Sequence, residues 1–379
     1  MLPVCTRAKT AKLLILRRKR FSVKAGSCAR AASRRASREA SYNGGFAFLP
    51  TSVNAPLTHE APPADPMAAE MLAVDEVIRR RLKSEVALVD QIGQYIVGAG
   101  GKRIRPRLVL LFSRALGYAG PHRFELAAII EFIHTATLLH DDVVDESALR
   151  RGHPTANALF GNAASVLVGD FLYSRAFQMM VEIDRMRVLE VLSDATNVIA
   201  EGEVLQLMNM HDADLAVEDY LRVIRYKTAK LFEASARLGA VIADVPRDVE
   251  DACADFGRAL GTAFQLVDDL LDYEGETTAL GKNVGDDLRE GKPTLPLLFA
   301  MAHGTPDESA LIRHAIEHGE VERLSDIVQI VRRTGAIEAT REAARREADH
   351  ARERLSSLPD SAARQALLDL CLRSVDRSY

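Results

Sequence analysis

Two groups of aspartates in this chain share one spacing. The first is Asp141, Asp142 and Asp145, and the second is Asp268, Asp269 and Asp272. The outer carboxylates of each group are four residues apart, so on a helix they lie on one face about one turn apart. Like charges at this spacing destabilise an isolated helix, and a hard divalent cation with oxygen ligands is the simplest way to offset them. The spacing therefore predicts magnesium ions that are bound by these carboxylates and by the phosphate oxygens of a substrate.

A solvated helix face is the ordinary alternative for one such group. Here both groups interrupt strongly apolar sequence, with Leu138 and Leu139 before the first and Leu270 and Leu271 inside the second. If the two helices face each other, carboxylates at about 4 Å repel by about 4 kcal/mol per pair at an effective dielectric of about 20. That charge is too large to leave unpaired, which again favours bound cations.

Basic residues suited to a diphosphate occur near both groups. They are Lys102 and Arg105 after Gly100-Gly101, His134 two turns before Asp141, Arg150 and Arg151 after the first group, Lys227 before Thr228, and Lys282 and Lys292 after the second group. Guanidinium groups and exposed backbone N–H groups bind phosphate oxygens well. Each basic segment is weak evidence alone, because a basic loop is usually only solvated, and a histidine such as His134 is often structural.

The rest of the sequence reads as helices. From Ala68 onward, Pro and most Gly are grouped in short breaks, and the apolar residues between them recur with a period near 3.6. The run from Leu126 to Asp145 contains neither Gly nor Pro. No sustained apolar and polar alternation indicates strands, and no fixed repeat is visible. We predict an all-α, single-domain bundle of about ten to twelve helices.

Composition excludes several classes of protein. The four cysteines are widely spaced with no CxxC pair, which indicates neither a metal site nor a disulfide framework and favours a reducing compartment. No apolar run reaches the roughly 18 residues that a membrane span needs. The first 45 residues carry a net charge of +11 against −4 for the whole chain, so the remainder carries −15. Such an acidic body is a poor nucleic-acid binder.

Residues 1–66 differ in composition from the rest of the chain. They are rich in Arg, Ala and Ser and nearly free of acids, and Met67 opens the first helix-like stretch. Three interpretations remain open: an organelle transit peptide, a disordered basic arm, or translation from a start codon upstream of the true one. We expect a basic, disordered extension over 1–66, a catalytic domain over 67–379, and a cytoplasmic location, with an organelle as the alternative.

The motifs together resemble the trans-isoprenyl diphosphate synthase, or polyprenyl synthetase, family over residues 70–379. The matching segments are GGKRIRP at 100–106, FIHTATLLHDDVVDESALRRG at 132–152, GD at 169–170, KT at 227–228, FQLVDDLLDYEG at 264–275 and GKNVGDDLREGKPTLPLL at 281–298. The resemblance implies an all-α bundle around a deep central cavity, usually in a homodimer. It also implies about two or three Mg²⁺ ions per active site.

The resemblance assigns roles to individual residues. Isopentenyl diphosphate would be bound by Lys102, Arg105, His134 and Arg151. The allylic prenyl diphosphate would be bound by Arg150, Lys227, Thr228, Gln265 and Lys282. The catalytic residues would be Asp141, Asp145, Asp268 and Lys227. Asp141, Asp145 and Asp268 would be the principal magnesium ligands, and Asp142, Asp269 and Asp272 would support them.

The implied reaction is ionisation of the allylic diphosphate, attack by isopentenyl diphosphate and loss of a proton. The growing tail would point from Asp141 toward the start of its helix, past Thr137, Ala136 and Ile133. Thr137 and Ala136 are both small, and small residues at these positions resemble the long-chain members of the family, although Ala136 could instead simply pack against a neighbouring helix. The resemblance thus implies a product of about seven to ten isoprene units, best matched by octaprenyl, which could pass to a membrane for quinone side chains. The alternatives are a shorter-chain farnesyl or geranylgeranyl synthase, a terpene cyclase and a non-catalytic regulatory subunit.

Overall fold

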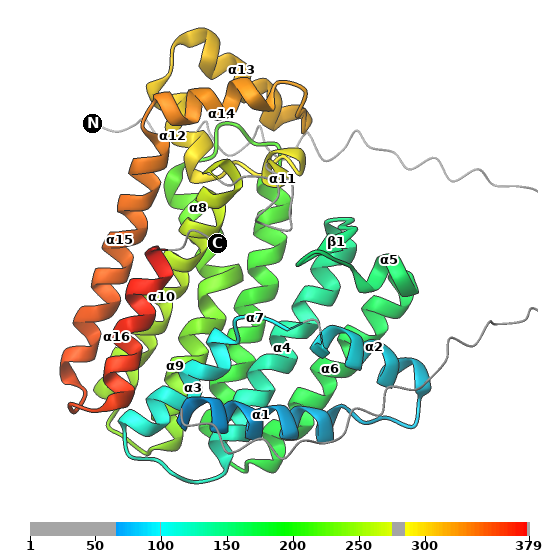
Figure 1. Ribbon diagram of the computed structural model, residues 1–379, viewed down its shortest axis with the longest axis vertical. Helices are drawn as coiled ribbons and strands as arrows, with labels where there is room; N and C mark the ends of the chain where they lie inside the picture. Colours follow the sequence, from blue (N-terminus) through cyan, green and yellow to red (C-terminus); the bar gives the residue numbers. More distant parts are fainter. Residues whose placement is uncertain (1–65, 99, 275–284, 377–379) are drawn as a thin grey trace, which may run out of the picture. The chain divides into compact units, whose positions relative to one another are not determined.

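The computed structural model describes residues 66–98, 100–274 and 285–376, and these are almost entirely helical (Figure 1). The first helices are α1 (Pro66–Leu82), α2 (Ala87–Gly98), α3 (Ile104–Ala115), α4 (His122–Val144), α5 (Ala156–Phe160), α6 (Asn162–Glu182) and α7 (Met186–Asn209). The middle of the chain forms α8 (Val217–Ile224), the π-helical turn η2 (Arg225–Ala229), α9 (Lys230–Ile242), α10 (Arg247–Glu274) and α11 (Asp286–Arg289). The last part forms α12 (Leu295–His303), α13 (Pro306–His318), α14 (Leu324–Arg333), α15 (Ala336–Arg354), the 3₁₀ turn η3 (Leu355–Ser357) and α16 (Ala362–Val375).

The predicted all-α class is confirmed. The described residues form more separate helices than the ten to twelve expected, because turns divide the chain into short pieces such as α5 and α11. The Gly- and Pro-free run from Leu126 to Asp145 forms most of α4, which begins earlier, at His122, and ends at Val144. The predicted extension, apart from Pro66, lies outside the described residues, so the division at residue 66 stays a prediction.

Four long elements position the two aspartate groups. The first group is at the end of α4 and the second is near the end of α10. Helix α9 packs against α4, α7 and α10, so all four lie together in the part of the fold that Figure 1 shows at its centre. Buried apolar side chains of α4, α6 and α7 form one core, and those of α3, α9, α10 and α16 form another. The aspartates therefore project from elements that are fixed on both sides by packed cores.

The only strands in the described residues form a short hairpin after α4. Strand β1 (Leu149–Arg150) pairs antiparallel with β2 (His153–Pro154), with Arg150 opposite His153. The turn residues Arg151 and Gly152 both have positive φ, 54° and 76°, which matches the twist of a tight two-residue hairpin. The hairpin directs Arg150 back toward the first aspartate group.

The described residues include two of the four cysteines. Cys253 and Cys371 are buried free thiols, and burial raises the pKa of each to about 12. Among the described residues, no helix combines the length and the apolar character needed to cross a bilayer.

Candidate active site

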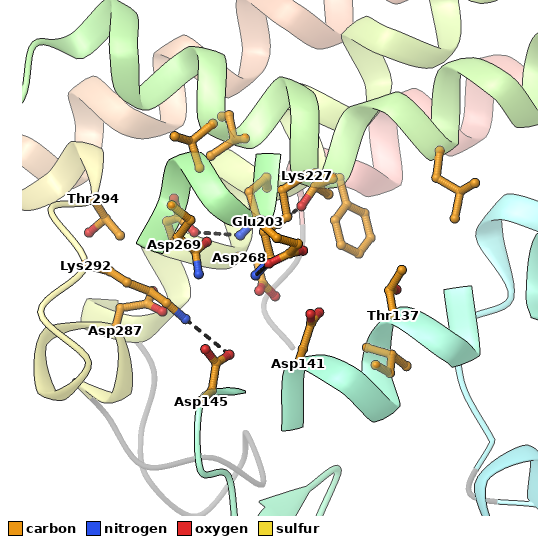
Figure 2. Close-up of a pocket in the computed structure, with 18 of the residues that line it drawn as sticks. Thr137, Asp141, Asp145, Glu203, Lys227, Asp268, Asp269, Asp287, Lys292 and Thr294 are labelled. Atoms are coloured by element: carbon orange, nitrogen blue, oxygen red, sulfur yellow. Dashed lines mark hydrogen bonds and ion pairs between the residues drawn. The ribbon is translucent and has the colours of Figure 1, made fainter. Parts of the chain in front are cut away.

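A cavity of about 630 Å³ separates the two aspartate groups. Its walls come from α4, α7, η2 and α10, together with residues 286–294. Figure 2 shows Asp141 and Asp145 at the end of α4 on one side and Asp268 and Asp269 on the other. The structure therefore brings together two groups that are more than a hundred residues apart in sequence.

Asp141 and Asp145 both line the cavity, although only Asp141 is inside α4. Asp145 is the C-terminal capping residue, and its N–H donates to the carbonyl of Asp141 at 2.8 Å. Burial raises the pKa of Asp141, and the nearby Lys227 ammonium partly counteracts this while Asp145 adds to it. Asp145 lies 3.6 Å from the ammonium of Lys292. The cavity thus holds two partly buried carboxylates with cations close by.

Asp142 does not line this cavity. Its side chain is fully buried, and its Oδ1 accepts from Nε and Nη2 of Arg150 at 2.8 and 2.6 Å. Arg150 does line the cavity, with its guanidinium anchored from behind by Asp142. Such a two-pronged pair holds a guanidinium in one orientation. The geometry gives Asp142 the role of holding Arg150.

In the second group, Asp269 is held by hydrogen bonds from neighbouring side chains. Asp269 is buried, and its carboxylate accepts from the hydroxyl of Tyr220 at 2.5 Å and from Nε2 of Gln265 at 2.7 Å. Burial, with Asp287 nearby, raises the pKa of Asp269 well above its usual range. Thr228 in turn donates to Oε1 of Gln265 at 3.0 Å. Thr228 and Gln265 therefore belong to a hydrogen-bonded chain that ends on Asp269.

Asp272 is held by the backbone that comes after the second group. Its carboxylate accepts N–H groups of Gly285, Asp286 and Asp287 at 3.1, 3.2 and 3.2 Å. Burial, with Asp287 nearby, raises the pKa of Asp272 to about 8. Asp272 thus fixes the start of the segment that carries Lys292 on the cavity wall.

The donor set fits a hard divalent cation that is shared with a phosphate ligand. Within the described residues, the carboxylates of Asp141 and Asp268 make no hydrogen bond or ion pair, so their oxygens are available. No three acidic, histidine or cysteine side chains in that part of the chain converge on one metal position. Magnesium commonly takes one or two carboxylates and completes its shell with water and phosphate oxygens. Carboxylates on facing walls suit that arrangement.

Arg105 and His134 form the best-defined basic pair. Arg105 Nη1 lies 3.1 Å from His134 Nε2, and its guanidinium lies over the Phe232 ring at 4.4 Å. An arginine can only donate, so Nε2 accepts and the ring is neutral with its proton on Nδ1. Burial and the adjacent Arg105 hold the pKa of His134 well below its usual range. Burial also lowers the pKa of Arg105 to about 10, so Arg105 carries the positive charge of the pair.

The other predicted basic residues mostly reach the same cavity. Lys102, Arg151 and Lys227 line it, and Arg151 donates to the carbonyl of Gly100. Lys282 lies outside the described residues. Lys292, noted in the sequence without an assigned role, lines the cavity as well.

Three further cavity residues were missed by the sequence analysis. Glu203 pairs with Lys227 at 2.6 Å, Tyr220 binds Asp269, and Asp287 lies beside the second group. Asp287 follows Asp286 in a segment already matched to the family, so this acidic pair was a usable signal. Glu203 and Tyr220 belong to none of the matched segments and offered no such signal.

The three residues expected beside the growing tail have different environments. Thr137 lines the cavity one turn before Asp141, and Figure 2 places it away from Lys292. Ile133 and Ala136 are fully buried in the core of α4 and α6 and are not among the lining residues. Apolar side chains of Ile199, Leu231 and Phe264 also face the cavity.

Known proteins share both the sequence and the fold. Residues 86–332 match the family model described as polyprenyl synthetase. Octaprenyl diphosphate synthase of Escherichia coli (strain K12) is 56% identical over 311 residues, covering 82% of this chain and 96% of that protein. The all-trans-nonaprenyl-diphosphate synthase (geranyl-diphosphate specific) of Rhodobacter capsulatus is 45% identical over 313 residues, covering 82% of this chain and 96% of that protein.

Solved structures agree with these relatives. A polyprenyl synthase from Caulobacter crescentus CB15, complexed with calcium and isoprenyl diphosphate, superimposes with a TM-score of 0.80 at 46% identity, covering 82% of this chain and 96% of that chain. A decaprenyl diphosphate synthase from Rhodobacter capsulatus gives 0.78 at 48% identity, covering 83% of this chain and 97% of that chain. The facing aspartates, the basic walls and these likenesses lead to one assignment: the chain belongs to the polyprenyl synthetase family.

Proposed function

We propose that this protein is a long-chain all-trans-polyprenyl diphosphate synthase that makes octaprenyl diphosphate. It condenses isopentenyl diphosphate repeatedly with an allylic diphosphate such as farnesyl diphosphate. The observation that carries the proposal is that carboxylates face each other across one cavity, Asp141 and Asp145 on one wall and Asp268 on the other. The same cavity is also lined by apolar side chains. The relatives named octaprenyl diphosphate synthase, at 52% and 56% identity, support the product length.

The allylic diphosphate binds between the two aspartate groups. Asp141, Asp145 and Asp268 would hold about two or three magnesium ions, which when bound neutralise the diphosphate and stabilise the charge it gains on leaving. Arg150 and Lys227 line the same cavity and add positive charge to it. Preorganised charges of this kind are effective because they need no rearrangement during the reaction.

Isopentenyl diphosphate binds at a second group of basic residues in the same cavity. Lys102, Arg105 and Arg151 supply the cations, and the neutral ring of His134 orients Arg105 through its Nε2. The C–O bond of the allylic diphosphate breaks, and the double bond of isopentenyl diphosphate forms a C–C bond with the resulting allylic cation. The condensed chain then loses a proton to the departing diphosphate, which restores a double bond. The side chains of Leu231 and Phe264 exclude water that would quench the cation.

Product analysis tests this function directly. Purified protein, given labelled isopentenyl diphosphate, farnesyl diphosphate and Mg²⁺, should yield mainly the eight-unit product, because the small Thr137 leaves the tail path open. Omitting the allylic primer or adding a chelator should abolish incorporation. A main product of three or four units would instead identify a shorter-chain synthase, and cyclised hydrocarbon without isopentenyl incorporation would identify a cyclase.

We propose that the protein forms a homodimer through α6 and α7. Helices α6 and α7 expose large apolar side chains, among them Leu167 at 67% and Met208 at 72% exposure. Isolated apolar residues are common on surfaces, but several on two adjacent helices favour contact with a second copy. Sedimentation should therefore give about twice the chain mass of 41.6 kDa. A single-chain mass at micromolar concentration would contradict the homodimer.

We further propose a cytoplasmic location and a product that passes to a membrane for quinone side chains. The free thiols of Cys253 and Cys371 agree with a reducing compartment. A fusion of residues 1–66 to a fluorescent reporter would distinguish this location from organelle import.

A further inference from the structure

Lys227 lies in an unusual turn of the backbone. Residues Arg225–Ala229 form a π-helical turn between α8 and α9, with Lys227 at its centre. A π turn inserts an extra residue into a helix; such turns are rare and frequently lie at functional sites. The turn directs Lys227 and Thr228 into the cavity, where both are lining residues.

Helix α7 approaches this turn very closely at Gly202. A Cβ atom at Gly202 would lie 2.6 Å from the backbone nitrogen of Lys227 and 2.9 Å from the carbonyl carbon of Tyr226. Both neighbours are backbone atoms and cannot rotate away. Glycine inside a helix costs roughly 0.5–1 kcal/mol relative to alanine, so the close approach has a real cost in stability. Any larger residue would separate α7 from the turn.

The next residue of α7 uses that proximity. Glu203 Oε2 lies 2.6 Å from Lys227 Nζ, and the two side chains are 31% and 18% exposed. Figure 2 shows the pair beside Asp268, opposite Asp141. Burial, together with Asp141 and Asp145, raises the pKa of Glu203 to about 7, while Lys227 opposes this rise. The contact with the Lys227 ammonium is therefore what favours the charged form of Glu203 in a cavity already rich in carboxylates.

We propose that Glu203 is a positioning residue for Lys227, and that Gly202 provides the space in which the two can meet. An ammonium group has three N–H donors, and the Glu203 carboxylate occupies one of them. The remaining two are then directed at the oxygens of the allylic diphosphate. The inference rests on the proposed function, because it assigns the ligand of Lys227 as that diphosphate.

Two substitutions at Glu203 separate a hydrogen-bonding role from a charge role. Glu203→Ala removes the acceptor and should raise the KM for farnesyl diphosphate about 10-fold or more, the size expected for losing a hydrogen bond to a charged group. The KM for isopentenyl diphosphate should change less than about twofold, because Arg105 and His134 are untouched. Glu203→Gln keeps an oxygen acceptor and should recover most of the loss.

A matched control and a second variant complete the test. Glu201→Ala alters an exposed carboxylate on the same helix, which accepts a hydrogen bond from Asn197, and should behave as wild type. Gly202→Ala should reproduce the KM effect of Glu203→Ala. Thermal unfolding of each variant identifies any general loss of structure.

Three outcomes would overturn the inference. Equal losses in Glu203→Gln and Glu203→Ala, with a higher Mg²⁺ requirement, would show that the charge matters and the hydrogen bond does not. A Glu203→Ala enzyme with wild-type KM values would remove Glu203 from the site, and equal changes in both KM values would indicate general disruption. Calorimetric binding of inorganic pyrophosphate with Mg²⁺ provides an independent readout. Weaker pyrophosphate binding by Glu203→Ala than by the wild type supports the positioning role. If the wild-type enzyme binds pyrophosphate but incorporates no isopentenyl diphosphate, that result rejects the proposed function and leaves the positioning role standing.

Discussion

Replacing Asp268 with alanine should lower kcat by several orders of magnitude, and Asp141→Ala should do the same. Each substitution removes a carboxylate that lines the cavity and makes no hydrogen bond or ion pair within the described residues. Losing a single preorganised group that stabilises developing charge costs about 10²–10³ in rate. Losing a metal ligand also weakens the metal ions that stabilise that charge, so we expect a larger loss. Steady-state assays over a range of Mg²⁺ concentrations measure both the rate and any increased metal requirement.

The control for these variants lies on the same helix as Asp268. Asp255 is 43% exposed and pairs with Arg258 on the surface of α10. Asp255→Ala should keep the wild-type rate, since surface ion pairs contribute at most about 1 kcal/mol to stability. Near-normal turnover in Asp268→Ala or Asp141→Ala would refute the assigned role of that carboxylate.

The sequence predicted the fold class because helical periodicity is a local signal. The run that contains the first aspartate group has apolar residues at helical spacing, and it forms α4 as expected. The aspartate spacing also indicated cation chemistry, and both groups border one cavity. Identical spacing, however, does not predict which carboxylate faces the cavity. Asp142 turns away because its partner, Arg150, comes from the β1–β2 hairpin eight residues later.

Contacts between distant elements explain the rest of what was missed. Tyr220 binds Asp269 across 49 residues, and Glu203 binds Lys227 from a different helix. A tyrosine or glutamate on an otherwise ordinary helix carries no local mark of such a partner. The π turn at Arg225–Ala229 is equally invisible, since its residues fit an α-helix by composition. These features depend on how helices pack, which the sequence of one helix does not specify.

The path of the growing chain gives the second large expected effect. Thr137→Phe should shorten the main product by several isoprene units, because Thr137 lines the cavity one turn before Asp141. Its hydroxyl donates to the carbonyl of His134 at 2.8 Å, so the side chain lies against α4 and leaves the space beside it open. An aromatic ring would fill that space while leaving the diphosphate sites intact. Chromatography of the products after dephosphorylation measures the change.

Ala136 gives the contrasting case that makes this test specific. Ala136 was expected either to border the growing tail, like Thr137, or to pack against a neighbouring helix. It is fully buried and does not line the cavity, which agrees with the second interpretation. Ala136→Phe should therefore combine any shortening of the product with a loss of stability of about 1–3 kcal/mol from overpacking. Thr137→Val keeps the size of the side chain and should leave the product length unchanged. An unchanged product in Thr137→Phe, with wild-type stability, would mean that the tail leaves Asp141 along another wall, past Ile199 or Leu231 of α7 and α9.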